Sequence, residues 1–249
     1  SPTYSYIKTS RDGGVNWDVE VFPTNPMWRA LALTGSADGR VLIAGSVDSK
    51  AWISTDSGAN WNQASYGDAY GFGVMDVACS SDGQIQYVLA GSTILKSTDS
   101  GATWSETGMG SHIWEQIAGS ANGQKIAVAM NTDTMVDGYI QVSTDAGATA
   151  VEKVVDARRT WVSVTASSDL ATIFASANVG NSPYLVRSTD GGTTWTALAT
   201  PSSLEGDITV ATSMAADGLR VAMVSWDYSL QTGFIYTSPD GGVTWYQQY

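Results

Sequence analysis

An eight-residue pattern of the form Ser-x-Asp-x-Gly-x-x-Trp recurs along this chain, and it constrains the fold more than any other feature. Six copies occur, which we number motif 1 to motif 6, and they begin at Ser10, Ser54, Ser97, Ser143, Ser188 and Ser238. The steps between successive serines are 44, 43, 46, 45 and 50 residues, whereas the spacing inside the motif stays constant. A fixed motif between variable spacers is typical of a repeat protein, in which each repeat is one supersecondary unit and loops absorb the length changes.

The residue types of the motif suit a tight turn between two strands. Aspartate accepts hydrogen bonds from the N–H groups ahead of it, glycine supplies a positive φ, and tryptophan covers the turn from the start of the next strand. No copy contains a nucleophile next to a general base, so we interpret the motif as structural. The structural residues predicted in this way are Asp12, Trp17, Asp56, Trp61, Asp99, Trp104, Asp145, Asp190, Trp195, Asp240 and Trp245.

Two expectations follow from this interpretation of the motif. We expect each aspartate to be buried against its own turn, so that Asp190→Ala and Asp99→Ala destabilise the fold. Motif 4 has Ala150 where the other copies have tryptophan. We therefore expect the fourth repeat to be the loosest, with the longer loop from Asn131 to Asp137 as its compensation.

A second kind of turn recurs between the motifs, and short apolar or alternating segments separate the two kinds. The second turn occurs at residues 36–39, 81–83, 121–123, 168–169 and 216–218. The segments between the turns predict four strands in each repeat. In the first full repeat these strands are Arg29–Thr34, Arg40–Ala44, Ala51–Thr55 and a strand that starts near Asn60.

The motif resembles the Asp-box of the bacterial-neuraminidase-type repeats. These repeats occur in sialidases, in xyloglucan-hydrolysing enzymes, in sortilin-type receptors and in the photosystem II assembly factor of cyanobacteria and plastids. The resemblance extends from Ser10 to Trp245, and it implies an all-β fold, a β-propeller of four-stranded blades with each Asp-box between strands three and four. It implies little about function, because these families share the turn and not the chemistry.

The repeats predict a single β-propeller domain over residues 1–249, with about six blade positions. The repeats span approximately residues 1–22 (partial), 28–66, 72–108, 114–155, 161–200 and 207–249. The first is a half-blade, because Tyr4–Thr9 and Asn16–Val21 are predicted as third and fourth strands with no first and second strand before them. An unpaired half-blade exposes strand edges. Three explanations stay open: the first half of this blade lies in a larger parent chain, a partner chain completes it, or a shortened blade closes the ring.

Composition agrees with one large all-β domain and narrows the choice of partners. The 249 residues are 43% hydrophobic and only 14% charged, which allows a sizeable core. The net charge is −12, but ten of the acidic residues lie in the two kinds of turn. The 12 lysines and arginines are scattered, which excludes nucleic acid as the main partner. No apolar run approaches 18 residues, so we expect no membrane span.

The variable loops are the place to look for function. Both tight turns of a repeat fall on one edge of its sheet, so the variable loops fall on the opposite edge, and loops on a rigid scaffold commonly carry binding residues. Recurrent aromatics at the starts of the innermost strands either line a central channel or pack between blades. The candidate ligand-binding residues on this loop edge are Trp28, Tyr66, Asp68, Tyr70, His112, Trp114, Arg158, Arg159, Trp161, Trp226, Asp227 and Tyr228.

We expect neither a metal site nor a cofactor, and no reactive thiol. Asp133 and Asp137 offer oxygen ligands beside Asn131, but their spacing matches no calcium loop, which favours a solvated acidic loop. His112 has no second histidine or cysteine close in sequence, so we interpret it as a polar loop residue. Cys79 ends an apolar strand, which favours a packed thiol.

Catalysis of the related kinds is disfavoured by missing residues. The resemblance to sialidases implies three converging arginines, a Tyr–Glu pair and an Arg-Ile-Pro motif, and no such motif is present. Arg11, Arg40 and Arg220 lie in or beside tight turns, on the opposite edge from the loops. The xyloglucan-hydrolysing enzymes place their two catalytic acids on separate propellers, and the assembly factor is expected to carry a basic patch. One acidic propeller reproduces neither arrangement.

The sequence therefore predicts a noncatalytic recognition and scaffold propeller, secreted or at the cell surface, with a glycan or a protein as its ligand. Two alternatives stay open. One is an Asp-box glycoside hydrolase of the sialidase or xyloglucanase type, with an acid such as Asp68, Asp133 or Asp227 in catalysis. The other is a structural repeat segment of a larger extracellular assembly, which the incomplete first blade would suit.

Overall fold

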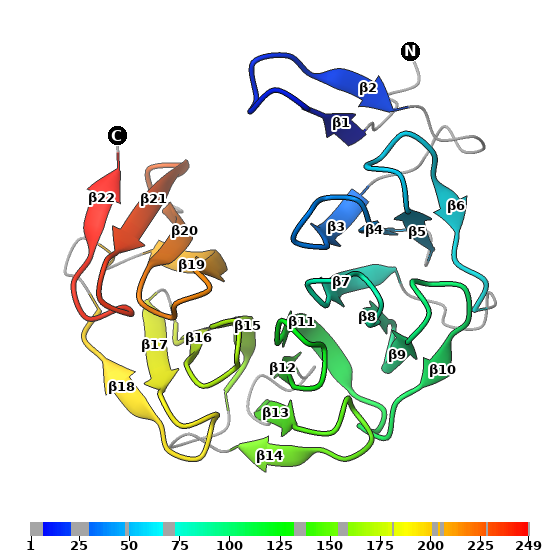
Figure 1. Cartoon of the computed structure of the whole chain (residues 1–249). Helices are drawn as coiled ribbons and strands as arrows, with labels where there is room; N and C mark the ends of the chain where they lie inside the picture. Colours follow the sequence, from blue (N-terminus) through cyan, green and yellow to red (C-terminus); the bar gives the residue numbers. More distant parts are fainter. Residues whose placement is uncertain are drawn as a thin grey trace. The chain divides into compact units, whose positions relative to one another are not determined.

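The structure is all-β and consists of small antiparallel sheets in chain order (Figure 1). The computed structural model describes residues 7–20, 30–47, 50–66, 73–131, 138–153, 159–180, 182–200, 204, 207–227 and 229–248. Among these residues, no helix is long and apolar enough to cross a membrane. The chain divides into two compact units, Ser1–Thr107 and Gly108–Tyr249. The prediction of one domain over residues 1–249 therefore stays a prediction.

The first unit contains a hairpin and two four-stranded sheets. The hairpin pairs β1 (Ile7–Thr9) with β2 (Asp18–Glu20). The next sheet contains β3 (Ala30–Gly35), β4 (Leu42–Ser46), β5 (Ala51–Ser54) and β6 (Asn62–Gln63). The second sheet contains β7 (Val74–Cys79), β8 (Gln86–Ala90), β9 (Thr93–Ser97) and β10 (Ser105–Glu106).

The second unit contains three four-stranded sheets. The first is built from β11 (Ile113–Gly119), β12 (Ile126–Asn131), β13 (Ile140–Ser143) and β14 (Val151–Lys153). The second is built from β15 (Trp161–Ala166), β16 (Ile173–Asn178), β17 (Pro183–Ser188) and β18 (Thr196–Leu198). The third is built from β19 (Asp207–Met214), β20 (Val221–Asp227), β21 (Thr232–Ser238) and β22 (Tyr246–Gln248).

The predicted strand pattern is confirmed for the described residues. Every four-stranded sheet is a meander in which each strand pairs with the next one along the chain, and all pairs are antiparallel. The hairpin β1–β2 likewise matches the predicted third and fourth strands of the first repeat. The first strand of each four-stranded sheet carries a register shift, for example between Trp114 and Gln116 in β11. Such bulges raise local twist and re-aim side chains.

Within each unit the core lies between successive sheets, because alternate side chains of each strand face a neighbouring sheet. In the second unit, one cluster joins Ile140 and Val142 to Trp161 and Ile173. A second cluster joins Phe174 and Leu185 to Val221, Met223 and Tyr236. In the first unit, Ile53 packs with Val77 and Val88 in the same manner. Within each unit, burial of apolar side chains between neighbouring sheets therefore stabilises the sheets.

Both kinds of turn lie on the same edge of each sheet, which we call the turn edge, as the sequence predicts. A backbone hydrogen bond joins the two turns within a sheet, as from the N–H of Gly191 to the carbonyl of Ala171 at 2.9 Å. Further bonds join second turns of successive sheets, as from the N–H of Ser168 to the carbonyl of Ala216 at 2.9 Å. The opposite edge, which carries the variable loops, we call the loop edge.

Candidate functional site

The polar side chains of the motifs on the turn edge form hydrogen bonds within their own turns. In motif 5, the Ser188 hydroxyl donates to Asp190 Oδ1 at 2.8 Å and accepts the N–H of Gly192 at 2.8 Å. The carboxylate also accepts the N–H of Thr194 at 2.8 Å and its hydroxyl at 2.7 Å. These bonds, led by the one from the Thr194 N–H, lower the pKa of Asp190 to about 2. The two bonds of the serine and the backbone N–H bond to the aspartate recur in motifs 2, 3, 4 and 6.

The expectation that the motif aspartates are buried is wrong. Asp56, Asp99, Asp145 and Asp190 are exposed, whereas the serines of motifs 2 to 6 are almost completely buried. The carboxylate lies outside the turn because each of its oxygens must reach N–H and hydroxyl groups that point to the surface. The hydrogen-bonding role of the aspartate is nevertheless confirmed. The serine is the buried centre of the turn, and the sequence pattern alone did not distinguish these two positions.

Motif 4 replaces its missing tryptophan by a different donor. In the other motifs, the indole N–H of the tryptophan donates to the carbonyl of the motif glycine, as from Trp195 to Gly192 at 3.1 Å. In motif 4, the backbone N–H of Gly108 donates to the carbonyl of Gly147 at 2.8 Å. A Cβ at position 108 would lie 2.1 Å from the carbonyl oxygen of Ala148, so only glycine can approach this closely. Thus, motif 4 keeps its acceptor satisfied without an indole.

The structure describes seven of the twelve predicted binding residues. These are Tyr66, His112, Trp114, Arg159, Trp161, Trp226 and Asp227. The other five lie outside the described residues, and they are Trp28, Asp68, Tyr70, Arg158 and Tyr228. The loop positions Asp133 and Asp137, which were considered as oxygen ligands of a cation, and of which Asp133 was also considered as a catalytic acid, lie outside them too.

Trp114 and Trp161 are core residues and offer no surface to a ligand. Both side chains are fully buried, at 0% exposure. Trp161 belongs to the apolar cluster between the sheets β11–β14 and β15–β18. Of the two alternatives for the recurrent aromatics, packing between sheets is therefore the one that applies to Trp161.

An aromatic group surrounds His112 at the loop edge of the sheet β11–β14. The imidazole lies edge-on to Trp114, with ring centroids 5.0 Å apart, and edge-on to Tyr139 at 5.9 Å. Its Nε2 lies 3.5 Å from Nε2 of Gln141. His112 is half-buried among these groups. It is the exposed end of a packed cluster and not an isolated polar loop residue.

Arg159 and Tyr184 form the second group on the loop edge. The Arg159 guanidinium carbon lies 3.9 Å from the centroid of the Tyr184 ring, a cation–π contact. Tyr184 in turn packs against Trp161, with centroids 6.4 Å apart. The backbone N–H of Arg159 donates to the carbonyl of Gly138 at 2.9 Å, which fixes the start of β15. Arg159 and Tyr184 are both half-buried.

Two aspartates are paired at the loop edge of the sheet β19–β22. Asp207 and Asp227 are opposite residues in the pairing of β19 with β20. Asp207 accepts a hydrogen bond from the Ser225 hydroxyl at 2.6 Å. Asp227 accepts bonds from the hydroxyl and N–H of Ser229 and from the N–H of Leu230, and these bonds lower its pKa. Both residues are buried. Because Asp227 accepts hydrogen bonds from residues that follow it closely in the chain, its role is to stabilise a turn.

The other described candidates are Tyr66 and Trp226. Tyr66 is half-buried and lies edge-on to Trp104, with centroids 5.8 Å apart. Trp226 is half-buried at the end of β20. Among the described residues, no group of three or more His, Cys, Asp or Glu side chains is placed to hold a metal ion. Burial raises the pKa of Cys79 to about 11, which keeps its thiol protonated.

Sequence reasoning missed Tyr139, Tyr184 and Asp207 as members of these groups. Each lies inside or beside a predicted strand, where the alternation of buried and exposed positions was not resolved by the sequence. Their position along the strands could have identified two of them, because Tyr184 and Asp207 lie at the loop-edge ends of their strands.

Solved structures show what this fold is similar to. No protein-family model matches the sequence, and no curated protein matches it either. A GH74 xyloglucanase from Xanthomonas campestris aligns with 96% of this chain at 19% identity, with a TM-score of 0.74. A putative TolB from Agrobacterium tumefaciens aligns with 94% of the chain at 14% identity and a TM-score of 0.69. YCF48 from Cyanidioschyzon merolae aligns with 92% at 16% identity and a TM-score of 0.58.

The neighbours differ in how much of their own length this chain matches. The chain spans 41% of the Xanthomonas xyloglucanase, but 84% of the TolB protein and 87% of YCF48. At these low identities the likeness concerns the fold alone. Together with the meander sheets of four antiparallel strands, it supports the β-propeller fold that the repeats predict.

Proposed function

We propose that this protein is a noncatalytic recognition and scaffold propeller, secreted or at the cell surface, which binds a glycan or a protein segment through its loop edge. The observation that carries the proposal is the pair Arg159 and Tyr184. A guanidinium stacked on a phenol presents directed donors beside a flat apolar surface. The apolar face of a sugar can pack on an aromatic ring, and a peptide carboxylate can accept hydrogen bonds from a guanidinium.

The contrast between the two edges supports the loop edge as the binding surface. Motif side chains on the turn edge bond their own backbone and have little capacity left for a partner. A neighbour of the same fold, YCF48, has been solved bound to a D1 peptide. That neighbour makes a protein segment a reasonable ligand class for this chain.

A glycoside hydrolase remains the alternative, because the xyloglucanases share the fold and because Asp207 and Asp227 lie opposite each other. A general acid needs a pKa near the working pH. The hydrogen bonds to Asp227 lower its pKa, and both carboxylates are buried. These features favour a structural pair over a catalytic one. The third possibility, a repeat segment of a larger assembly, depends on surfaces other than the loop edge.

Binding assays with loop-edge and turn-edge variants test this proposal. The purified chain would be applied to a glycan array and to a peptide array, and the strongest binder of each class measured by calorimetry. We expect Arg159→Ala to weaken binding at least about tenfold, and Trp226→Ala, alone or with Tyr228→Ala, to weaken it as well. Thr193→Ala, an exposed position in motif 5, is the matched control and should bind normally.

Two results would overturn the proposal. One is binding that survives the loop-edge substitutions but is lost on changing an exposed turn-edge residue. The other is hydrolysis of xyloglucan or a sialoside by the pure chain, abolished by Asp227→Asn, which would establish the hydrolase alternative.

A further inference from the structure

Among the described residues, arginine side chains donate to the backbone carbonyl of the fourth residue in two motifs. Arg187 of β17 donates to the carbonyls of Asp240 and Gly241 in motif 6, at 3.0 and 3.2 Å. Arg11 of motif 1 donates a longer bond to the carbonyl of Ser57 in motif 2, at 3.5 Å. Gly241 and Ser57 are both the fourth residue of their motif. The turn backbone of a motif can therefore accept hydrogen bonds from a guanidinium.

Motif 3 has the same backbone at its fourth residue, Ser100, but no described residue donates to the carbonyl of Ser100. Its φ of 57° is close to the 61° of Ser57 and the 72° of Gly241. The serine and aspartate bonds of motif 3 also match those of motif 6. Arg187 is the residue before a motif serine, and the corresponding residue of β5 is Ile53, which has no donor in its side chain. Motif 3 thus presents the acceptor without the arginine.

A hollow of about 260 Å³, which we call the motif-3 hollow, lies between motif 3 and the outer strands of the sheet β3–β6. All of its lining residues belong to the first unit, and they include Ile53, Thr55, Asn62, Asp99 and Ser100. Beside motif 6, the side chain of Arg187 fills the corresponding space, because a Cβ on Gly241 would lie 2.6 Å from its Nη1. The motif-3 hollow therefore lies where motif 6 holds an arginine side chain.

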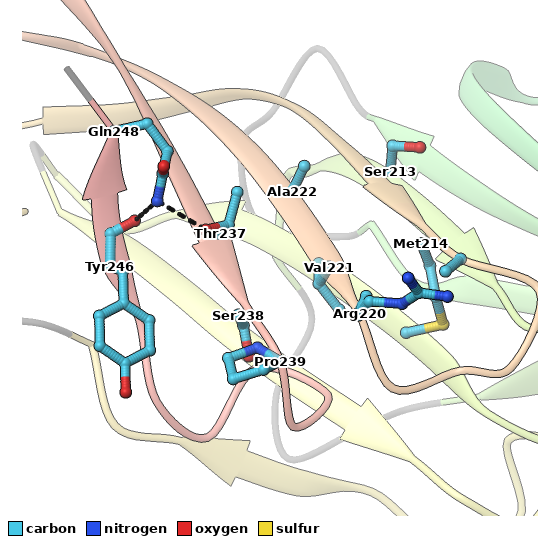
Figure 2. A pocket seen from close by; sticks show the side chains of 11 residues that line it. Ser213, Met214, Arg220, Val221, Ala222, Thr237, Ser238, Pro239, Tyr246 and Gln248 are labelled. Carbon is cyan, nitrogen blue, oxygen red and sulfur yellow. Dashed lines mark hydrogen bonds between the residues drawn. The ribbon is translucent and has the colours of Figure 1, made fainter.

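The charge around the motif-3 hollow favours a cationic ligand. Hollows on other sheets contain a cation of their own, namely Lys125 on the sheet β11–β14 and Arg220 on the sheet β19–β22 (Figure 2). No lysine or arginine is among the described residues that line the motif-3 hollow. Asp99 is exposed, and hydrogen bonds led by that of the Thr103 hydroxyl lower its pKa to about 2. Because the hydrogen-bond donors to Asp99 are neutral, its carboxylate keeps its negative charge at neutral pH.

We propose that the motif-3 hollow binds an arginine side chain from a basic segment of a partner protein. The guanidinium donates to the carbonyls of Asp99 and Ser100, as that of Arg187 does in motif 6, and its aliphatic stem lies along Ile53. A guanidinium presents donors in a fixed fork that can reach two neighbouring carbonyls, whereas an ammonium is a compact point charge, so arginine is preferred to lysine. This site uses backbone carbonyls on the turn edge, and it is independent of recognition through the loop edge.

Titration of the isotope-labelled full chain with three short peptides, followed by amide resonances in NMR spectra, tests the proposal. The peptides are capped glycine–serine sequences that differ only in one central residue, which is arginine, lysine or citrulline. Citrulline keeps the shape of arginine but has no charge. We expect the arginine peptide to shift the amide resonances of Ser100 and Gly101, with a Kd on the order of 1 mM for a single side chain. The lysine and citrulline peptides should bind there at least about threefold more weakly.

Thr55→Arg blocks the motif-3 hollow with the chain's own guanidinium. Thr55 is exposed, lines the hollow, and is the second residue of motif 2, the position that Arg11 has in motif 1. The new side chain should donate to the carbonyl of Ser100 as Arg11 does to motif 2, and so raise the Kd of the arginine peptide at least about tenfold. Thr144→Arg is the matched control, because Thr144 is the exposed second residue of motif 4 and lines the hollow beside motif 5 instead. It adds the same charge and should leave the titration at Ser100 unchanged.

Asn62→Lys, at another exposed lining position, replaces Thr55→Arg if the melting transition shows that the latter does not fold. The proposal is overturned if the arginine peptide leaves the Ser100 amide unshifted, or if the arginine and lysine peptides bind there equally. Equal loss of binding in Thr55→Arg and Thr144→Arg would mean attraction to the acidic chain as a whole, which also contradicts the proposal. The loop-edge proposal is tested with other ligands and other variants, so each proposal can fail without the other.

Discussion

Motif 4 and motif 5 form the same hydrogen-bonded turn, but different groups donate to the carbonyl of the motif glycine. The serine hydroxyl donates to the aspartate at 2.7 Å in motif 4 and at 2.8 Å in motif 5. The threonine N–H bonds to the aspartate at 2.9 and 2.8 Å. Motif 5 adds the Trp195 indole, whereas motif 4 uses the Gly108 N–H on the same carbonyl position.

This comparison shows that the buried serine and its carboxylate define the turn, and that the tryptophan is one of two ways to satisfy the glycine carbonyl. The loss of a large aromatic at Ala150 therefore need not loosen the repeat. We now expect motif 4 to be as well ordered as motif 5, in place of the expectation from sequence that it is the loosest. The proposed compensation by the loop 131–137 falls mostly outside the described residues.

Acid should have the largest effect, and it should act on both motifs alike. Hydrogen bonds, led by those from Thr149 and Thr194, lower the pKa values of Asp145 and Asp190 from 3.8 to about 2. Because the folded-state pKa is depressed, this stabilisation is complete above about pH 4 and is lost as the pH falls toward about 2. Asp12, Asp99 and Asp240 titrate in the same range. Thermal melts from pH 6 to pH 2 should show a falling Tm below pH 4, and a Tm that stays constant to pH 2 would contradict the account.

Gly108→Ala should be the most damaging single substitution in motif 4. The added Cβ would lie 2.1 Å from the carbonyl oxygen of Ala148, so the backbone must move and the bond to Gly147 is lost. We expect a loss of about 2–3 kcal/mol in the free energy of unfolding. Gly233→Ala is the control, since its Cβ would find its nearest neighbour at 3.4 Å. Equal stability of the two variants would mean that Gly108 does not replace the indole.

Ser143→Ala and Ser188→Ala should cost similar amounts, about 1–3 kcal/mol each. Each removes a buried hydroxyl that bonds both the aspartate and the motif glycine N–H. Denaturant unfolding measures both values. Thr144→Ala and Thr189→Ala, exposed neighbours in the same motifs, should change little. A much smaller loss for Ser143→Ala would indicate that motif 4 is already loose.

Ala150→Trp should have the smallest effect, under about 1 kcal/mol in either direction. The new indole N–H would compete with the Gly108 N–H for the carbonyl of Gly147, so restoring the consensus residue gains no new bond. Calorimetric melts would measure the change. A gain of more than about 2 kcal/mol in the free energy of unfolding would show that the missing tryptophan ring destabilises motif 4.

The sequence predicts the local part of this fold well. The spacing of the motifs and the second turns placed four strands in each repeat, because turn chemistry is fixed by neighbours along the chain. It assigned burial to the aspartate instead of the serine, since both residue types are common in such turns. It could not predict the role of Gly108, because this residue lies 39 positions before Gly147 in the sequence and the contact between them depends on the tertiary fold.

The residues of the candidate site are harder to predict from the sequence, because the site depends on which side chains share a face of a sheet. His112 and Arg159 were identified as loop residues, but their partners Tyr139 and Tyr184 were not, since one position of strand register decides whether a ring faces the core or the loop edge. Trp114 and Trp161 were named as binding candidates and are core residues. Recurrence at equivalent positions signals shared packing as readily as shared function.

Hydrogen exchange of the Gly147 and Gly192 amides tests the central claim most directly, that the serine–aspartate turn is sufficient without its tryptophan. Both amides donate to the motif serine, at 2.9 and 2.8 Å. The account predicts protection factors that agree within about a factor of ten. Exchange of Gly147 several orders of magnitude faster than that of Gly192 would show that the tryptophan holds the turn and would contradict the account.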